Sequence, residues 1–203
     1  KPKGVLCTNN DPSGRVRAID LLGRVKERVY PVGRLDSSST GLLLMTNDGE
    51  LAEYLMHPRY GIERTYVAEV KGKVGPRAIE KLKKGIWMSG GRTQPARVKI
   101  LHGGRQESRL EITLREGRNR EIRRMLAAQG HRVWKLRRIR LGPLTIFVVI
   151  AGGNVTEKDR VPRGIRGRNP QKLAHVKRFF HVGVIECLTA VVEHMMRERQ
   201  RLA

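Results

Sequence analysis

Alternating hydrophobic and polar positions along the chain predict several β-strands. Over residues 63–72 the side chains of Tyr66, Ala68 and Val70 fall on one side. Two similar runs lie on either side of Gly103-Gly104, which predicts a β-hairpin. The other strand-like stretches begin at residue 1 or cover residues 29–36, 41–46 and 133–146.

Apolar residues at helical spacing predict short helices between these strands. The helix over residues 119–130 has Asn119 as its N-cap and places Ile122, Met125 and Leu126 toward the core. Further helices are expected at residues 18–25, 47–57 (with Asn47 at the N-cap) and 75–86. Strands followed irregularly by helices, with a hairpin, indicate an α+β fold with a mixed, mainly antiparallel sheet and flanking helices.

The character of the sequence changes near Ile150. We therefore expect one domain over residues 1–150 and an extension over residues 151–203. The first part of the extension is rich in Gly, Pro and Arg, which indicates a linker or an extended arm. Its last part has an apolar stripe at helical spacing, which predicts an amphipathic helix that packs on this domain or on a partner. A membrane-surface helix is the alternative, and acidic residues in the segment disfavour it.

Charge gives the first indication of function. The 203 residues include 42 Lys and Arg but only 19 Asp and Glu, so the formal net charge is +23. Such an excess predicts a polyanionic partner, because basic side chains displace counterions from nucleic acid. No long apolar span, signal peptide or lipidation motif supports a membrane. Cys7 and Cys187 form neither a disulfide framework nor a zinc pattern, and free thiols fit the cytoplasm.

The basic residues concentrate between Arg115 and Arg140, where ten of them stand against two glutamates. Alternation in the predicted strand places Leu136, Arg138 and Arg140 on one face. Arg137 falls on the other face, so both faces carry arginine. Aromatic residues make up only 4% of the chain, which argues against stacking along a run of single-stranded bases. This pattern predicts a nucleic-acid-binding protein that reads shape and backbone and handles one or a few bases.

Asp36 is a single acid in a turn rich in Gly, Ser and Thr. It has three interpretations: a cap for local backbone amides, an ion pair with Arg34, or a nucleophilic or proton-transferring carboxylate. One carboxylate cannot run the paired chemistry of glycoside hydrolysis or hold two metal ions. Chemistry on a nucleobase at its glycosidic bond suits it better.

The stretch around Asp36 resembles the central motif of pseudouridine synthases of the RsuA/RluB type, with G-R-L-D, then Thr40-Gly41, an apolar run and Asn47-Asp48-Gly49. Three further stretches resemble family motifs: KPKGV at the start, ERTYVAEVKG, and EGRNREIRRM followed by LRRIRLGPL. The resemblance covers residues 1–146 in the order of the family and is closest to the RluB branch.

This resemblance implies a pseudouridine synthase fold with a catalytic cleft, and the isomerisation of a uridine in ribosomal RNA. The C1′–N1 bond breaks, the uracil rotates while bound, and C5 joins C1′. Asp36 matches the catalytic aspartate, Tyr66 the tyrosine that packs on the base, and Arg123 the basic residue that pairs with the aspartate. The reaction requires no cofactor and no metal. The RluB-like motif favours large-subunit over small-subunit RNA as the substrate.

An everted uridine requires a cationic groove, since extrusion from an RNA stem costs a few kcal/mol. The residues expected to contact RNA are Arg34, Arg118, Asn119, Arg120, Arg124, Arg137, Arg138 and Arg140. We expect a monomer that binds ribosomal RNA and no membrane. Family members often begin with an S4-type RNA-binding domain, whereas these motifs begin at the first residue. Either that domain is missing from the sequence or other surfaces select the target.

Two alternatives share parts of this pattern. A non-catalytic RNA-binding or ribosome-assembly protein that retains the fold predicts salt-sensitive binding without base chemistry. A hydrolytic enzyme that removes the base also requires base extrusion and an aspartate, but it leaves an abasic site. The combination of Asp36, Tyr66 and Arg123 favours the synthase over both alternatives.

Overall fold

The computed structural model describes residues 1–22, 25 and 27–145. Residues Lys1–Gly142 form one compact unit, and the chain from Pro143 onward belongs to a second unit, of which the strand β10 (Leu144–Thr145) is described. The expected basic arm and amphipathic helix of residues 151–203 lie outside the described residues, and a domain boundary near residue 150 stays a prediction. In the described part of the chain, no helix is long and apolar enough to cross a membrane.

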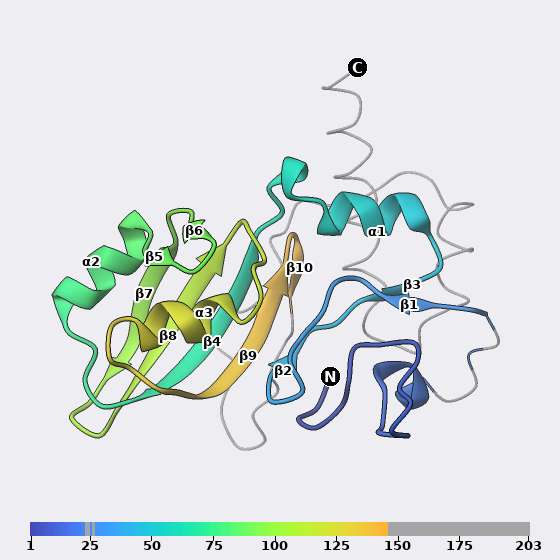
Figure 1. Ribbon diagram of the computed structural model, residues 1–203, viewed down its shortest axis with the longest axis horizontal. Coiled ribbons are helices and arrows are strands. Elements are labelled where there is room, and N and C mark those ends of the chain that lie inside the picture. Colours follow the sequence, from blue (N-terminus) through green and yellow to red (C-terminus); the bar gives the residue numbers. More distant parts are fainter. Residues whose placement is uncertain (23–24, 26, 146–203) are drawn as a thin grey trace, which may run out of the picture. The chain divides into compact units, whose positions relative to one another are not determined.

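The first unit is built on a sheet with the strand order β9-β4-β8-β7 (Figure 1). These strands are β9 (Val133–Leu141), β4 (Arg64–Lys71), β8 (Glu107–Leu114) and β7 (Arg97–Gly103). Each neighbouring pair is antiparallel, whereas the short strand β2 (Thr40–Gly41) pairs with β9 in parallel. This arrangement confirms the predicted α+β fold with a mixed, mainly antiparallel sheet, and also the hairpin across Gly103-Gly104.

Two helices lie against one face of the sheet, α2 (Pro76–Lys84) and α3 (Glu121–Ala127) (Figure 1). The helix α3 turns Ile122, Met125 and Leu126 into the main hydrophobic core, where none of them is more than 3% exposed. The face that the sheet turns toward α3 includes Ala68 and Val70 of β4, both fully buried, with Tyr66 partly buried beside them. The predicted core-facing sides of this strand and this helix are therefore correct.

A second, smaller core lies under the helix α1 (Gly49–Met56). It joins Ala52 and Leu55 of this helix to Val32 and Leu141. The two-residue strands β1 (Tyr30–Pro31) and β3 (Met45–Thr46) pair beside it, and short 3-10 turns cover Ala18–Leu21 and Pro58–Tyr60. The single buried strand expected over residues 41–46 is wrong. Residues 42–44 are irregular and only partly buried, because they connect β2 on β9 to β3 on β1.

Both predicted N-caps are wrong by one residue. The helix α1 is capped by Asp48, whose Oδ1 accepts a hydrogen bond from the Leu51 amide at 3.0 Å. The helix α3 begins after Arg120, which adopts the left-handed conformation with φ 49°. Here Glu121 reaches back to the Arg118 amide at 3.0 Å, so an acid inside the first turn satisfies the backbone donor instead of Asn119.

A β-bulge in β9 changes the expected alternation of its side chains. Tyr66 of β4 pairs with Arg138, while the preceding Thr65 pairs with Arg140, so Ile139 is the extra residue. Arg138 is buried like Leu136, whereas Arg140 is exposed. The expectation that Arg138 and Arg140 share one face is therefore wrong, because the bulge shifts the pattern by one residue.

Gly41 brings the loop of Asp36 against the sheet. Its φ is +114°, and a Cβ at this position would lie 2.2 Å from the carbonyl oxygen of Arg138. Only glycine permits this close parallel pairing between β2 and β9. The neighbouring amide of Leu42 donates to the same carbonyl at 2.9 Å, so the loop that ends at β2 has a fixed position over β9.

Candidate active site

A cavity of about 240 Å³ opens between the Asp36 loop and the sheet. Its wall combines Asp36 with Tyr66 of β4 and Arg138 of β9, while Arg118 and Arg120 come from the segment that leads into α3. Segments that are far apart in the sequence therefore meet at one site. The carboxylate of Asp36 is 25% exposed, which leaves it accessible from the cavity.

The Asp36 turn is held from both sides. Within the turn the Ser39 amide donates to the Asp36 carbonyl at 3.0 Å, and from outside the Gly4 amide donates to the Ser37 carbonyl at 2.7 Å. The ammonium group of Lys1 bonds to the Val5 carbonyl at 2.7 Å and reaches the Ser37 carbonyl at 3.5 Å. The opening KPKGV segment thus supports the loop that carries the aspartate.

Two arginines face the carboxylate of Asp36. Nη1 of Arg120 and Nε of Arg123 lie 3.5 Å and 3.7 Å from the same oxygen, Oδ2. These separations describe ion pairs without hydrogen bonds of ordinary length. Nη1 of Arg123 donates to the Val133 carbonyl at 2.9 Å, which fixes the guanidinium. Among the described residues, Arg34 forms no ion pair with Asp36; it is exposed and lines the cavity.

Burial lowers the pKa of the Arg123 guanidinium, and the charge of Arg120 acts in the same direction, while Asp36 opposes both. Arginine stays protonated despite such a shift. Nε and Nη2 of Arg123 are buried and have no hydrogen-bond partner among the described residues. Both groups therefore remain available as hydrogen-bond donors.

Two further guanidinium groups line the cavity near Tyr66. Arg138 is only 2% exposed; its Nε donates to the Leu42 carbonyl at 2.7 Å, and its buried Nη2 has no partner among the described residues. Arg64 donates to the Leu55 and Met56 carbonyls at 3.0 Å and 3.3 Å, and burial lowers its pKa. Sequence reasoning missed Arg64, although it precedes Tyr66 by two residues on the same strand face.

A pair of glutamates forms another part of the cavity wall. Glu121 is 4% exposed, and burial together with the neighbouring Glu116 raises the pKa of Glu121 to about 8. Burial acts to raise the pKa of Glu116 as well, but hydrogen bonds from Glu121, from the Gln94 amide and from Arg118 lower it. At neutral pH the raised pKa favours a neutral, protonated Glu121 beside Glu116.

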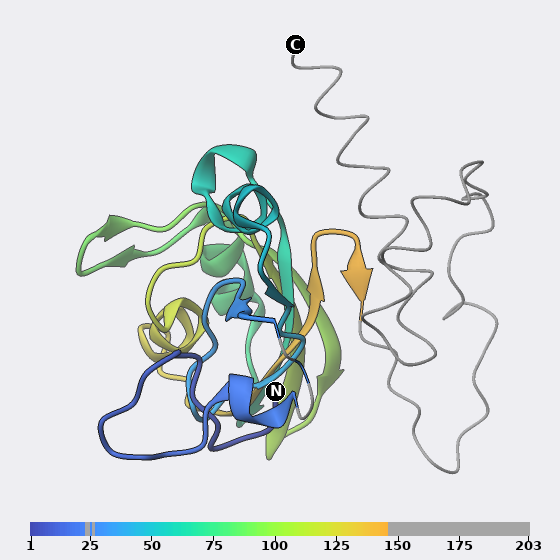
Figure 2. The same cartoon turned by 90° about the vertical axis from the view of Figure 1, so that its right-hand side faces the viewer.

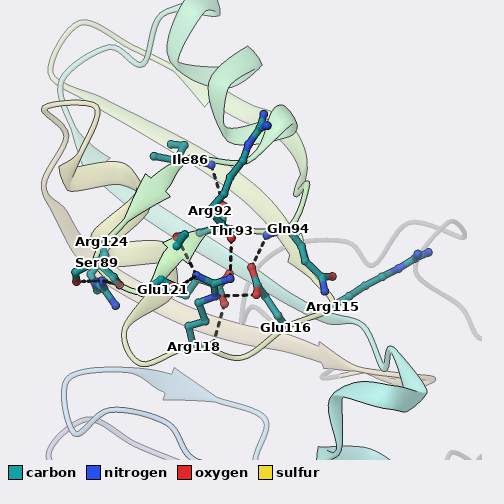
Figure 3. Close-up of polar contacts among 12 residues, drawn as sticks. Ile86, Ser89, Arg92, Thr93, Gln94, Arg115, Glu116, Arg118, Glu121 and Arg124 are labelled. Carbon is teal, nitrogen blue, oxygen red and sulfur yellow. Dashed lines mark hydrogen bonds and ion pairs between the residues drawn. The ribbon is translucent and has the colours of Figure 1, made fainter.

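Arg118 and Arg124 bind a hairpin made of β5 (Trp87–Met88) and β6 (Gly91–Arg92) (Figure 3). The guanidinium of Arg118 donates to the carbonyls of Gly90 and Gly91, both at 3.0 Å, and of Arg92 at 2.7 Å. Its Nε donates to Glu116 at 2.8 Å. Arg124 donates to the carbonyl of Ser89 at 2.7 Å. Both arginines were predicted to line an RNA groove, and here their donors are engaged by the protein.

The remaining predicted contacts are spread over the surface. Asn119 is exposed beside Arg120, while Arg137 is exposed on the sheet face opposite Arg138. A second cavity of about 510 Å³ adjoins the Asp36 pair, because Arg120 and Arg123 line it together with His131 and Arg132. Sequence reasoning did not select His131 or Arg132, although both lie in the basic segment between α3 and β9.

Comparison with known proteins gives a consistent result. Residues 1–128 match the family model described as RNA pseudouridylate synthase. The ribosomal large subunit pseudouridine synthase B of Bacillus subtilis (strain 168) is 47% identical over 140 residues, which cover 68% of this chain and 57% of that protein. The protein of the same name from Pasteurella multocida is 41% identical over 160 residues, or 78% and 46% of the two chains. The chain thus spans about half the length of the curated relatives it matches.

Solved structures support the same fold. A pseudouridylate synthase crystal structure superposes with a TM-score of 0.65 and 30% sequence identity, over 71% of this chain and 61% of that chain. The archaeal box H/ACA complex of Nop10 and Cbf5 gives a TM-score of 0.51 at 20% identity, over 71% of this chain and 46% of the other. The second similarity concerns the fold alone.

Proposed function

Because the chain belongs to the RNA pseudouridylate synthase family, we propose that it isomerises a uridine in ribosomal RNA to pseudouridine, with large-subunit RNA as the substrate. The observation that carries this proposal is the meeting of Asp36, Arg123 and Tyr66 at one site. Asp36 and Tyr66 line the same cavity, and Arg123 forms an ion pair with the aspartate. Its relatives named ribosomal large subunit pseudouridine synthase B support the choice of substrate.

In the proposed reaction Asp36 acts on the ribose of the everted uridine, either by adding to the nucleotide or by helping to remove a ribose proton. Arg120 and Arg123 keep its carboxylate charged and aimed. The C1′–N1 bond breaks, the uracil rotates beside Tyr66, and C5 joins C1′. The C5 proton is then lost and N1 ends protonated, so the product is an isomer of the substrate and no cofactor is consumed.

The guanidinium groups of Arg64 and Arg138 suit the detached base. Both line the cavity, neither has a carboxylate partner among the described residues, and Nη2 of Arg138 still has a free donor. Negative charge develops on the uracil when the C1′–N1 bond breaks. Donors that are already fixed in place stabilise such charge without reorganising. We therefore propose that Arg138 stabilises the negative charge on the detached base. Arg120 lines both cavities and lies where they adjoin.

The RNA backbone is proposed to follow the basic surface around the site. Arg34 and Arg120 stand at the first cavity, and the second cavity continues from Arg120 to His131 and Arg132. Asn119, Arg137 and Arg140 remain candidate outer contacts, whereas Arg118 and Arg124 act on RNA indirectly through the hairpin. We also propose a cytoplasmic location, because ribosomal RNA is the proposed substrate, and a monomer, because Asp36, Tyr66 and Arg123 all come from one chain.

The test is tritium release from ribosomal RNA labelled at C5 of uridine, with RNA binding measured in parallel. We expect the wild type to release label and Asp36→Asn to bind the RNA without releasing label. Release by the mutant at the wild-type rate would exclude Asp36 from the chemistry. Binding by both proteins without release from either subunit's RNA would instead indicate an RNA-binding protein that retains the fold. Abasic sites in the product would indicate hydrolysis.

A further inference from the structure

The β5–β6 hairpin over residues 86–94 projects from the body of the first unit (Figure 2). A hairpin with strands of two residues is at best marginally stable without other contacts. This hairpin has many such contacts. The Arg118 and Arg124 guanidiniums bond to four of its carbonyls, as described above, and the Gln94 amide donates to Glu116 at 2.5 Å. It is therefore a rigid projection, anchored to the segment that also lines the catalytic cavity.

The base of the hairpin is equally constrained. Gly85 has a φ of +86°, and a Cβ there would lie 2.3 Å from the Thr93 carbonyl oxygen. Ile86 and Thr93 are joined by two hydrogen bonds. The Ile86 amide donates to the Thr93 hydroxyl at 2.9 Å, and the Thr93 amide donates to the Ile86 carbonyl at 2.9 Å. The strands thus leave the core at a fixed angle, which determines where the exposed side chains of the hairpin point.

The hairpin exposes a large aromatic side chain. Trp87 is 75% exposed, while its neighbours Ile86 and Met88 are buried or packed on the core. Burial of an indole ring stabilises a protein, and an exposed ring does not contribute this free energy. Arg92 is the cross-strand partner of Trp87 and is also exposed. Nη2 of Arg92 donates to the Lys84 carbonyl at 3.1 Å, so the hairpin meets the end of α2, where Lys83 and Lys84 are exposed.

We propose that Trp87 stacks on a nucleobase of the substrate RNA outside the catalytic cavity, with Arg92 facing the adjoining phosphate. A partner for this surface must combine a flat aromatic face with negative charge, and an RNA strand supplies both at each nucleotide. Stacking on an indole tolerates any base, because every base has a π-face. This inference deepens the proposed function and rests on RNA being the substrate.

The anchoring explains how such a contact acts at a distance. Arg118 lines the catalytic cavity and at the same time holds the hairpin by three carbonyls. The stacked base and the everted uridine are therefore held at a fixed separation. Trp87 positions the RNA and takes no part in the bond changes, so its loss affects binding of the RNA and leaves the chemical step unchanged.

The first experiment uses intrinsic fluorescence, since the chain has only two tryptophans, Trp87 and Trp134. Trp134→Phe leaves Trp87 as the sole reporter, and Trp87→Phe leaves Trp134. Each protein is titrated with a large-subunit ribosomal RNA transcript and, separately, with heparin, a polyanion without bases. We expect RNA, but not heparin, to quench Trp87 and to protect it from acrylamide. Absence of quenching by RNA, or equal quenching by heparin, would overturn the proposal.

The second experiment measures affinity for the same transcript at several salt concentrations. We expect Trp87→Ala to weaken binding roughly 5- to 150-fold, the equivalent of about 1–3 kcal/mol for one stacked base. The slope of log affinity against log salt should not change, because no phosphate contact is lost. Trp87→Phe should retain most of the affinity, and Trp134→Ala serves as the matched control. Wild-type affinity in Trp87→Ala, or a reduced salt slope, contradicts the assignment.

Two controls separate this inference from the proposed chemistry. Trp87 is exposed, so Trp87→Ala should unfold at the same urea concentration as the wild type, and its single-turnover rate at saturating RNA should be unchanged. A reduced single-turnover rate would place Trp87 in the chemical step and overturn the proposed role. If no protein releases tritium but Trp87 still governs RNA affinity, the isomerase assignment fails while the stacking contact stands.

Discussion

Two pairs of arginines lie within seven residues of one another and do different work. Arg120 and Arg123 direct their charge at the carboxylate of Asp36, at 3.5 Å and 3.7 Å. Arg118 and Arg124 instead donate hydrogen bonds to the carbonyls of a hairpin about 30 residues earlier in the chain. The difference teaches that a dense basic motif is not one RNA-binding surface. One pair of its arginines faces the Asp36 carboxylate, and the other pair holds the β5–β6 hairpin in place.

The largest expected effect concerns the pair that faces Asp36. Arg123→Met removes the buried charge beside the carboxylate and should lower the single-turnover rate of tritium release about 100- to 1,000-fold, as loss of one preorganised electrostatic partner commonly does. RNA affinity should change little, because Arg123 is only 12% exposed. Arg77→Met, at an exposed arginine of α2 that lines neither cavity, is the matched control. A variant that loses affinity but keeps its rate would assign Arg123 to phosphate binding.

A smaller effect is expected from the pair that holds the hairpin. Arg118→Met leaves three carbonyls without their donor and removes one of the donors to Glu116. We therefore expect about 1–2 kcal/mol less stability in urea, at the low end because Arg118 is 30% exposed. Amide hydrogen exchange over residues 86–94 should accelerate, and half-saturation of the reaction should require more RNA. The rate at saturating RNA should fall far less than in Arg123→Met. Equal losses in both variants would remove the distinction between the pairs.

The smallest effect is the pH dependence that Glu121 contributes. Its pKa rises from 4.5 to about 8 on folding, so the folded protein retains a proton that the unfolded chain has released. Between these values the free energy of unfolding therefore decreases as the pH rises, through this group. Glu121→Gln keeps a donor toward Glu116 and an acceptor for the Arg118 amide. Urea midpoints across this range should fall less steeply in the variant, and parallel curves would contradict the raised pKa of Glu121.

Regular periodicity made much of the fold predictable. The alternation through Tyr66, Ala68 and Val70 and the helical spacing of Ile122 and Met125 depend on local sequence, and both sets contact the core as predicted. The β5–β6 hairpin was not predicted, because strands of two residues have no period to detect. The bulge at Ile139 was not predicted either, since it arises from pairing with β4 rather than from β9 itself.

The candidate site was predictable only in part. The resemblance to a family selected Asp36, Tyr66 and Arg123, and the sheet and α3 bring Tyr66 and Arg123 near the aspartate. The hydrogen bonds from Arg118 and Arg124 to backbone carbonyls could not be predicted. Every residue has a carbonyl group, and the sequence does not show which of them will accept a bond. Arg64 and the buried Glu121 show the same limit. Their environments depend on long-range packing, whereas the sequence alone shows only two more charged residues.

The parallel pairing of β2 with β9 also has a consequence for the order in which the protein folds. Thr40 pairs with Arg137, so 137 − 40 = 97 residues separate the two partners. Contacts of such long range form late, because the intervening loop must close first. During synthesis the Asp36 turn and its contacts with residues 1–5 are made early, but its attachment to β9 through β2 forms only after β9 leaves the ribosome. The position of Asp36 over the sheet is therefore completed only once β9 is in place, well after Asp36 itself has been translated.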